Sequence, residues 1–157
     1  MKNFINKVFL NKKANFKFLI EDTLEAGIVL EGWEAKSIIE SGFLNMDNAY
    51  VVVKDGEVFI LNLLIKKQCS TSTHYEAKID RTKKLLLHKK EIMKIMGKVQ
   101  KIGYTIIPIR AYFKKNKLKI QIALAKGKTE FDKRDTLKKE EIKRENQLEF
   151  KEKIKGL

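Results

Sequence analysis

Hydrophobic and polar residues alternate in several short segments of this chain, and turn residues separate the segments. Tyr50 to Val53 and Glu57 to Ile65 flank the turn sequence Lys54-Asp55-Gly56. Gly103 to Phe113 and Leu118 to Ala125 flank a second short, polar tip. Alternation places the apolar side chains on one face of a strand, and Asp-Gly between two such runs is a strong hairpin signal. The pattern therefore predicts two β-hairpins.

Other segments of the chain are strand-like or helical. Phe16 to Ile20 and Ala26 to Leu30 have the composition of strands, and Trp33 to Ser41 is typical of a short helix that Gly42 closes. From Lys89 to Ile102 the spacing becomes helical, with lysines opposite an apolar face. That face consists of Ile92, Ile95, Met96, Val99 and Ile102, and Gly103 follows as the stop.

These elements predict a mainly β fold, that is, a small β-rich α+β domain. Many short antiparallel strands, with a helix before the final hairpin, suggest a small closed or partly closed barrel, of which the OB type is a nucleic-acid-binding example. Pro108 falls inside a predicted strand. Proline cannot donate to a strand ladder, so it indicates an edge or a bulge there.

The last part of the chain differs in composition. Of residues 126–157, 19 of 32 are charged, with 11 basic and 8 acidic side chains. Such a segment cannot bury a core by itself. We therefore predict a folded domain over residues 1–125 and a charged C-terminal tail over 126–157 that is disordered when free. Phe150, Ile154 and Leu157 recur at helical spacing, so the last turns can become a helix on a suitable surface.

The net charge is +14, of which +11 belongs to residues 1–125 and +3 to the tail. A surplus of this size attracts polyanions such as RNA, DNA or anionic membranes. Membranes are the weakest candidate, because no stretch approaches 18 uncharged apolar residues and Lys7 interrupts the apolar N-terminus. A single cysteine, Cys69, excludes an internal disulfide and fits a reducing cytoplasm.

Catalytic motifs are absent from the sequence. There is no nucleophile elbow, phosphate-binding loop, metal-spaced His/Cys group or dinucleotide glycine pattern. We expect no catalytic residue, metal or cofactor. The residues that a nuclease or another small enzyme would have to use are Cys69, Ser70, Ser72, His74, Asp80 and His88.

Two basic clusters carry the stronger signal. Arg81 to Lys101 contains eight basic residues and one acid, and Arg110 to Lys119 contains five basic residues and no acid. For any one lysine, a solvated position is the simpler interpretation. If both clusters lie on one side of the domain, they form an electrostatic footprint for phosphates.

Several ordered motifs resemble the SmpB family of SsrA-binding, or tmRNA-binding, proteins. The resemblance covers roughly residues 10–136. The segments are N-K-K-A-N-F at Asn11 to Phe16, E-A-G-I-V-L-E-G-W-E-A-K-S at Glu25 to Ser37, R-T-K-K-L-L-L-H at Arg81 to His88, G-Y-T at Gly103 to Thr105 and K-G-K-T-E-F-D-K-R at Lys126 to Arg134. Ordered blocks are more specific than any single short pattern.

The resemblance implies an OB-like antiparallel β-barrel with about three flanking helices, which binds the tRNA-like domain of tmRNA. Glu25 can accept hydrogen bonds from base amines or ribose 2′-hydroxyls. Leu86 belongs to a run of three leucines that cannot all face inward, so the sequence fits an exposed Leu86 and a buried one equally well. The implied RNA-binding residues are Asn11, Glu25, Lys36, Arg81, Lys83, Lys84, Leu86 and Lys119.

For the tail, the resemblance implies binding to the small-subunit decoding centre and the empty mRNA channel of a stalled ribosome, where the tail becomes helical. Phe131 is a solitary aromatic residue suited to stacking on a nucleobase, and Asp132-Lys133-Arg134 matches the family motif. The implied ribosome-binding residues are Lys126, Gly127, Lys128, Phe131, Asp132, Lys133 and Arg134.

The leading interpretation is a cytoplasmic RNA-binding factor of trans-translation that binds rather than catalyses. Its partners would be tmRNA, the ribosome and, indirectly through alanyl-tmRNA, elongation factor Tu. The alternative is a ribosomal or general RNA-binding protein with an OB-like domain; an enzyme that uses His74 or His88 is a third possibility. Two departures from the family pattern are Phe43, in place of a basic or polar residue, and Lys78-Ile79-Asp80, which lacks the usual Asp-Pro.

Overall fold

The structure, a computed structural model, describes residues 6–67 and 78–156. The chain divides into two compact units, Met1–Gly127 and Lys128–Leu157. The strands of the first unit are β1 (Phe9–Leu10), β2 (Phe18–Ile28), β3 (Tyr50–Lys54), β4 (Glu57–Leu61), β5 (Lys83–Leu86), β6 (Tyr104–Lys114) and β7 (Lys117–Gly127). Its helices are α1 (Ala14–Lys17), α2 (Gly32–Ser41) and α3 (Lys89–Val99).

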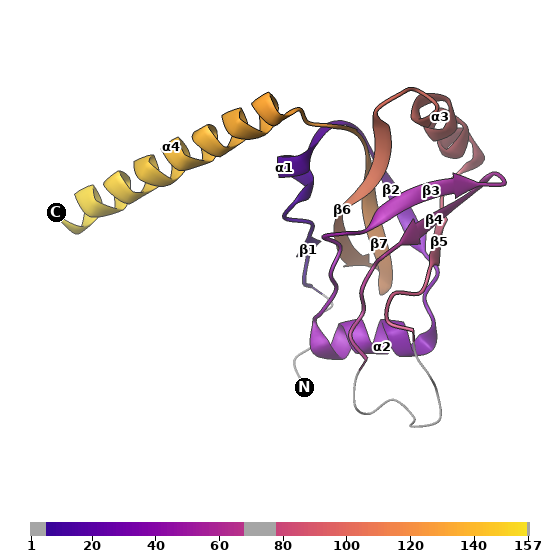
Figure 1. Cartoon of the computed structure of the whole chain (residues 1–157). Coiled ribbons are helices and arrows are strands. Elements are labelled where there is room, and N and C mark those ends of the chain that lie inside the picture. The colour runs from indigo at the N-terminus through magenta and orange to yellow at the C-terminus, as the bar shows by residue number, and fades with distance from the viewer. Residues whose placement is uncertain (1–5, 68–77, 157) are drawn as a thin grey trace. The chain divides into compact units, whose positions relative to one another are not determined.

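All strand pairs of the described residues are antiparallel, and their order is β1-β6-β3-β4-β5-β2-β7. β6 also pairs with β7, so the six strands β6, β3, β4, β5, β2 and β7 form a ring of strand pairings (Figure 1). The predicted class, a mainly antiparallel β fold with accompanying helices, is confirmed.

Both predicted hairpins are confirmed, and their turns explain why the strands reverse there. Asp55 and Gly56 have positive φ angles of 52° and 74°, and Lys115 and Asn116 have 50° and 60°. Two consecutive left-handed residues form the turn whose twist matches that of paired strands. The β4 strand ends at Leu61, earlier than predicted, because Asn62 also adopts a positive φ of 57°.

The prediction of separate strands at 16–20 and 26–30 is wrong, because β2 is one strand of 11 residues. The polar residues between them do not break the strand; Glu21 and Thr23 are exposed on it, next to a register shift between Ile20 and Asp22. The four-residue helix α1 precedes the strand and was not predicted.

The helix α2 follows the prediction closely, whereas α3 ends before the predicted stop at Gly103. α2 ends at Gly42, whose φ of 60° is the left-handed conformation that glycine adopts without strain. α3 buries Ile95 but ends at Val99, and Ile102 is 98% exposed, so its predicted place on the apolar face is wrong.

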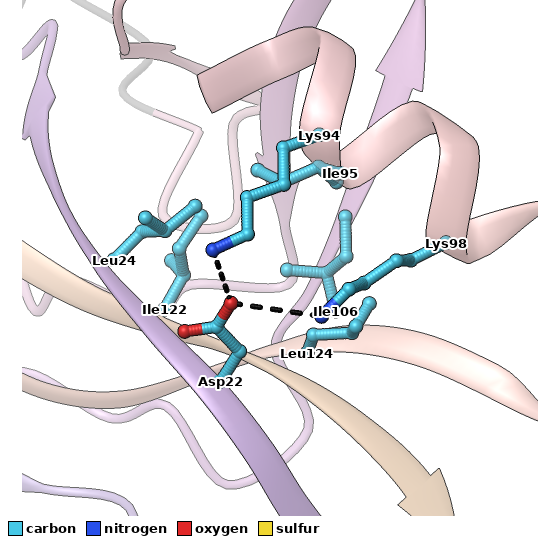
Figure 2. Close-up of a pocket in the computed structure, with 8 residues that line it drawn as sticks. All are labelled: Asp22, Leu24, Lys94, Ile95, Lys98, Ile106, Ile122 and Leu124. Carbon is cyan, nitrogen blue, oxygen red and sulfur yellow. Dashed lines mark ion pairs between the residues drawn. The ribbon is translucent and has the colours of Figure 1, made fainter. Parts of the chain in front are cut away.

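An acidic residue of β2 ties α3 to the sheet. The carboxylate of Asp22 lies 2.6 Å from Nζ of Lys94 and 3.7 Å from Nζ of Lys98, in a small pocket that apolar side chains such as Ile95 also line (Figure 2). Lys94 donates a hydrogen bond to this carboxylate and lowers the pKa of Asp22, against a smaller opposing effect of burial.

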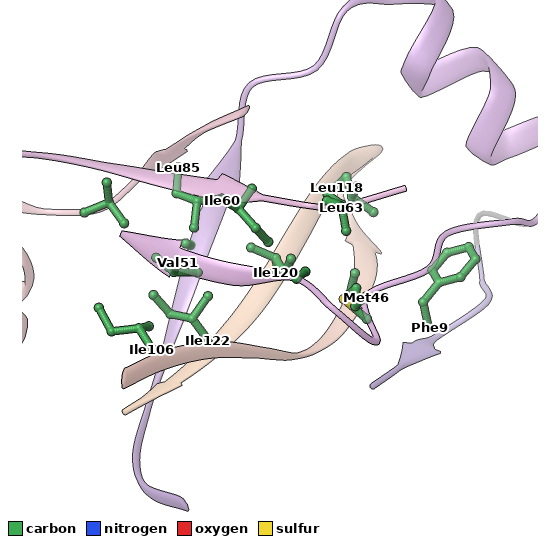
Figure 3. Packing of buried hydrophobic residues seen from close by; sticks show 14 of the residues in the cluster. Phe9, Met46, Val51, Ile60, Leu63, Leu85, Ile106, Leu118, Ile120 and Ile122 are labelled. Carbon is green, nitrogen blue, oxygen red and sulfur yellow. The ribbon is translucent and has the colours of Figure 1, made fainter. Parts of the chain in front are cut away.

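The main core lies on the inner side of the sheet, where side chains from all the longer strands meet (Figure 3). β7 supplies Leu118, Ile120, Ile122 and Leu124 at every second position, as its alternation predicts. A smaller cluster on the other side of the sheet consists of Ala14, Ile107, Ala123 and Ala125. The register shift between Pro108 and Arg110 confirms the bulge predicted at the proline.

The second unit contains one helix, α4 (Glu130–Lys155). Thr129 and Asp132 form a capping box at its start, and no residue of the helix is buried. The sequence predicts disorder for this segment in the free chain, and the structure differs by describing a helix. A helix without buried side chains gains no stability from packing within its own unit, so the order of the free segment stays a prediction.

Candidate nucleic-acid interface

The candidate interface is a set of polar side chains on the outer side of β2, β7 and β6. Because inner positions of β7 alternate with outer ones, Lys119 and Gln121 point away from the core. The register places Gln121 between Glu25 and Arg110, and Lys119 between Gly27 and Tyr112. We call these five side chains the outer polar face: Glu25, Arg110, Tyr112, Lys119 and Gln121.

Only part of this side of the sheet is open. Farther along β7, Ala123 and Ala125 are buried in a cluster with Ala14 of α1. Their small side chains let the α1 segment lie close to the sheet. The outer polar face begins where this cover ends, so the fold leaves its polar groups accessible to a partner.

The carboxylate of Glu25 is held from two directions. The hydroxyl of Tyr112 donates to Oε2, and Nζ of Lys114 lies 3.4 Å from Oε1. The hydrogen bond from Tyr112, more than the lysine, lowers the pKa of Glu25, and the same bond raises the pKa of Tyr112. Glu25 is therefore ionised at neutral pH and acts purely as an acceptor.

A surface groove brings three of the predicted RNA-binding residues together. Its lining includes Glu25, Leu86 and Lys119, as well as His88 and Gly27, and Gly27 is in register with both Leu86 and Lys119. The Leu86 side chain is 54% exposed, so the structure selects the outward position from the two that the sequence allowed. A Cβ added to Gly27 would lie 3.3 Å from Cβ of Leu86, which shows how closely the leucine packs on this glycine.

Lys83 is a correction to the predicted set. Its side chain is fully buried, and Nζ donates to the carbonyl of Arg81 at 2.7 Å and lies 3.4 Å from Oε1 of the equally buried Glu34. Burial lowers the pKa of Lys83, and the nearby Glu34 opposes this effect. An ammonium in this position holds α2 to β5 and is not available to a phosphate.

Asn11 is also an interior residue, with 8% of its surface exposed. Its amide donates to the carbonyls of Pro108 at 2.9 Å and Met46 at 3.2 Å, and its Oδ1 accepts from the backbone of Lys13. All of its polar atoms thus organise the chain around β1. Asn11 is not among the residues that line the groove, whereas the sequence led us to expect an RNA contact there.

Three other predicted cations lie in ion pairs at or near the surface. Arg81 donates to Oε2 of Glu34 at 2.8 Å, Lys84 lies 2.5 Å from Glu57, and Lys36 lies 3.9 Å from Glu40. Arg81 and Lys84 belong to the first basic cluster, as do Lys94 and Lys98, which pair with Asp22, so these ion pairs offset much of the charge of that cluster. The second cluster, Arg110 to Lys119, therefore contributes more of the accessible positive charge around the groove.

The predicted ribosome-binding residues surround the start of α4 and the end of β7. Phe131 is 78% exposed. Oδ2 of Asp132 accepts from the backbone and hydroxyl of Thr129 at 3.1 and 2.6 Å, and these bonds lower its pKa. Lys133 pairs with Glu130 at 3.2 Å, and Lys128 donates to Thr136 at 2.9 Å. Lys126 and Gly127 end β7, and Arg134 is exposed on α4.

Sequence reasoning missed Tyr112 and Gln121, and it identified Arg110 only as a member of the second basic cluster. The hairpin turn contained the signal, because a two-residue tip at 115–116 fixes Tyr112 opposite Lys119 and Arg110 opposite Gln121. The contact with Glu25 was not accessible in this way, since it joins residues 87 positions apart.

The catalytic candidates gain little from the structure. Cys69, Ser70, Ser72 and His74 lie outside the described residues. His88 is the N-cap residue of α3, where its backbone amide donates to the carboxylate of Glu91, and Asp80 is exposed. Within residues 6–67 and 78–156 there is no acidic, histidine or cysteine cluster suited to a metal, and no helix long and apolar enough to span a membrane.

Comparisons with known proteins give consistent matches. The family model described as SmpB protein matches residues 8–152. An SsrA-binding protein of Leptothrix cholodnii is 50% identical over 135 residues, which cover 86% of this chain and 87% of that protein. One of Methylibium petroleiphilum is 47% identical over 144 residues, or 92% of each chain. A solved structure described as "tmRNA-SmpB: a journey to the center of the bacterial ribosome" matches with 34% identity and a TM-score of 0.65, over 78% of this chain and 85% of that one.

Proposed function

The chain belongs to the SmpB protein family, and we propose that it is a tmRNA-binding protein of trans-translation that acts on stalled ribosomes. The observation that carries the proposal is the meeting of Glu25, Leu86 and Lys119 in one surface groove. These three residues come from separate blocks of the sequence. Their assembly on one face supports a single RNA-binding site rather than scattered contacts.

Each of the three side chains suits a different part of an RNA. Lys119 provides a cation for the phosphate backbone, which fixes the RNA in register. Glu25 repels phosphate but accepts from a 2′-hydroxyl or a base amine, and exposed Leu86 offers an apolar surface to an unstacked base. The folded tRNA-like domain of tmRNA presents all three features. We keep Arg81, Lys84 and Lys36 as proposed RNA contacts, which would have to exchange their ion pairs for phosphates.

The ring of strand pairings supports an OB-like barrel as the scaffold of the body. A closed sheet fixes the strands that carry Glu25 and Lys119 relative to one another, while the helices pack outside. Such a site loses little conformational entropy when RNA binds, because its groups are held in place beforehand.

The tail supplies the second half of the function. We expect residues 126–157 to be disordered in the free protein and to enter the decoding centre and empty mRNA channel as a helix, with Phe131 stacking on ribosomal RNA and Asp132, Lys133 and Arg134 contacting it. Ordering costs free energy, which only a channel without mRNA repays. Elongation factor Tu enters indirectly, with alanyl-tmRNA. The protein thus binds without catalysing a reaction, in the cytoplasm.

One observation favours a second candidate, a general RNA-binding protein. The net charge of +14 attracts any RNA through its phosphates. The two candidates differ in discrimination, because charge alone gives no preference among RNAs of similar length.

A salt-controlled titration separates these candidates. The tRNA-like domain of tmRNA, an ordinary tRNA and a hairpin of equal length would compete for wild type and Glu25→Ala. We expect wild type to prefer the tRNA-like domain and Glu25→Ala to lose that preference. Equal binding to all three RNAs, weakened only by salt, would leave the general RNA-binding protein as the conclusion.

A further inference from the structure

A tyrosine outside the predicted contact set is bonded to the acidic residue of the groove. Tyr112 lies on β6 and Glu25 on β2, with β7 paired between them. Since the tyrosine hydroxyl donates to Oε2 of Glu25, the two side chains meet over β7, at the centre of the outer polar face. Lys119 of β7 is in register with Tyr112 on one side and with Gly27 on the other.

The tyrosine ring has neighbours of its own. The guanidinium of Arg110 lies 5.4 Å from the centroid of the Tyr112 ring, a distance suited to a cation–π contact. Nε of Arg110 donates to Oε1 of Gln121 at 2.5 Å, which fixes the guanidinium over β7. A chain of contacts from Gln121 through Arg110 therefore limits the movement of the tyrosine.

The carboxylate of Glu25 keeps acceptor capacity after these contacts are made. A carboxylate has about four lone-pair sites. The hydroxyl of Tyr112 uses one site on Oε2, and Nζ of Lys114, at 3.4 Å, approaches Oε1. The side chain of Glu25 remains exposed, so further donors can reach it.

We propose that Tyr112 is a positioning residue for RNA recognition: its hydroxyl fixes the Glu25 carboxylate so that the remaining acceptor sites meet a ribose 2′-hydroxyl or a base amine. This inference rests on the proposed RNA-binding function. It assigns discrimination between RNAs to the Tyr112–Glu25 pair and attraction of phosphates to the surrounding lysines. Loss of the hydroxyl frees the carboxylate to rotate, so RNA binding must then restrict it again.

A double-mutant cycle tests the pair through affinity for the tRNA-like domain of tmRNA at several salt concentrations. The variants are Tyr112→Phe, Glu25→Ala, which removes the acceptor, and the double variant. Tyr112→Phe keeps the ring beneath Arg110 and removes only the hydroxyl. Tyr104→Phe is the matched control, because Tyr104 lies on the same strand and donates to Glu21 at 2.7 Å, away from the outer polar face.

We expect Tyr112→Phe to weaken binding about three- to tenfold with an unchanged salt slope, since no phosphate contact is lost. In the Glu25→Ala background the same change should have almost no further effect, because the hydroxyl then has no acceptor to position. The RNA affinity of Tyr104→Phe should stay within about twofold of the wild-type affinity.

Two results would overturn the positioning role. One is a Tyr112→Phe affinity equal to that of wild type. The other is an equal loss in both backgrounds, which would mean that the hydroxyl contacts RNA itself or acts through the fold. Failure of the underlying function is recognised separately, because wild type would then not prefer the tRNA-like domain over the ordinary tRNA.

Discussion

At the scale of single residues, the groove depends on the absence of a side chain at Gly27. Its Cβ position lies 3.3 Å from Cβ of Leu86, so Gly27→Ala must push the leucine outward or shift the strands. We expect a loss of about 1 kcal/mol in unfolding free energy and a several-fold loss of RNA affinity. Urea unfolding and titration with the tRNA-like domain measure the two effects.

Gly97→Ala provides the matched control for this substitution. Gly97 lies within α3, and an added Cβ there meets nothing within 4 Å. Alanine should therefore stabilise the helix by about 0.5–1 kcal/mol and leave RNA affinity unchanged. If Gly27→Ala bound RNA as tightly as Gly97→Ala, the position of Leu86 would not matter for recognition.

The buried pair of Glu34 and Lys83 predicts a large effect on stability. Glu34→Ala leaves the ammonium of Lys83 in the interior without its carboxylate, and Arg81 loses one of its two carboxylate partners, keeping Glu31. We expect a cost of about 3–5 kcal/mol in urea unfolding. Lys84→Ala, which breaks an exposed pair with Glu57, should change stability by less than about 1 kcal/mol. Similar small costs for both would contradict the assignment of Lys83 as an interior anchor.

The residue scale is also where sequence reasoning was least complete. In R-T-K-K, Arg81, Lys83 and Lys84 look alike as basic residues, yet alternation along β5 turns Lys83 inward and Lys84 outward. The sequence contains that alternation. Which of the two lysines faces inward depends on Glu34, 49 residues earlier, because its buried carboxylate stabilises an interior lysine. The bond between Tyr112 and Glu25 likewise requires the order of the strands.

At the scale of elements, local chemistry was a better guide. Left-handed turn residues fixed both hairpins, and Gly42 ended α2 where predicted. The unpredicted features, α1 and the continuous β2, depend on contacts with β6 and β7 that no local pattern encodes. Short segments gain their structure from such packing.

The link between α3 and β2 predicts a change with pH. The lowered pKa of Asp22 means that its ion pairs with Lys94 and Lys98 stabilise the fold above the unfolded pKa of about 3.9. This contribution is lost as pH falls through the lower, folded pKa. Because the pairs are partly exposed, Asp22→Asn should lower the free energy of unfolding by less than about 1 kcal/mol at neutral pH, and by less still in high salt. Urea unfolding curves over a pH series check this, and wild type and variant should be equally stable at the acid end of the series.

The same substitution has a consequence for RNA binding. Asp22→Asn releases two lysines of α3, so non-specific RNA affinity should rise and the salt slope should steepen by about 0.9 for each new phosphate contact. Glu140→Gln on α4 changes the net charge equally and serves as the control. An equal rise in both variants would indicate net charge alone, rather than the release of Lys94 and Lys98.

At the scale of the whole molecule, the chain divides between Gly127 and Lys128. The body contains the groove and the core, whereas α4 buries none of its residues. A chain that ends at Lys128 should therefore fold, and its affinity for the tRNA-like domain should stay within about twofold of the full chain, because no groove residue is removed. Fluorescence titration and thermal unfolding of the shortened chain check both expectations.

Rescue of stalled ribosomes, unlike affinity for the tRNA-like domain, should be lost when the chain ends at Lys128. If the tail reports the empty channel by ordering there, the shortened chain should bind tmRNA yet fail to tag stalled peptides in a reconstituted translation reaction. A full-length chain with residues 130–155 scrambled keeps the tail's composition and charge. Failure of this variant as well would show that Phe131 and Asp132-Lys133-Arg134 act through their positions, not through charge alone. Parallel loss of tmRNA affinity and tagging on truncation would instead mean that body and tail form a single binding surface, and the division of labour between them would be wrong.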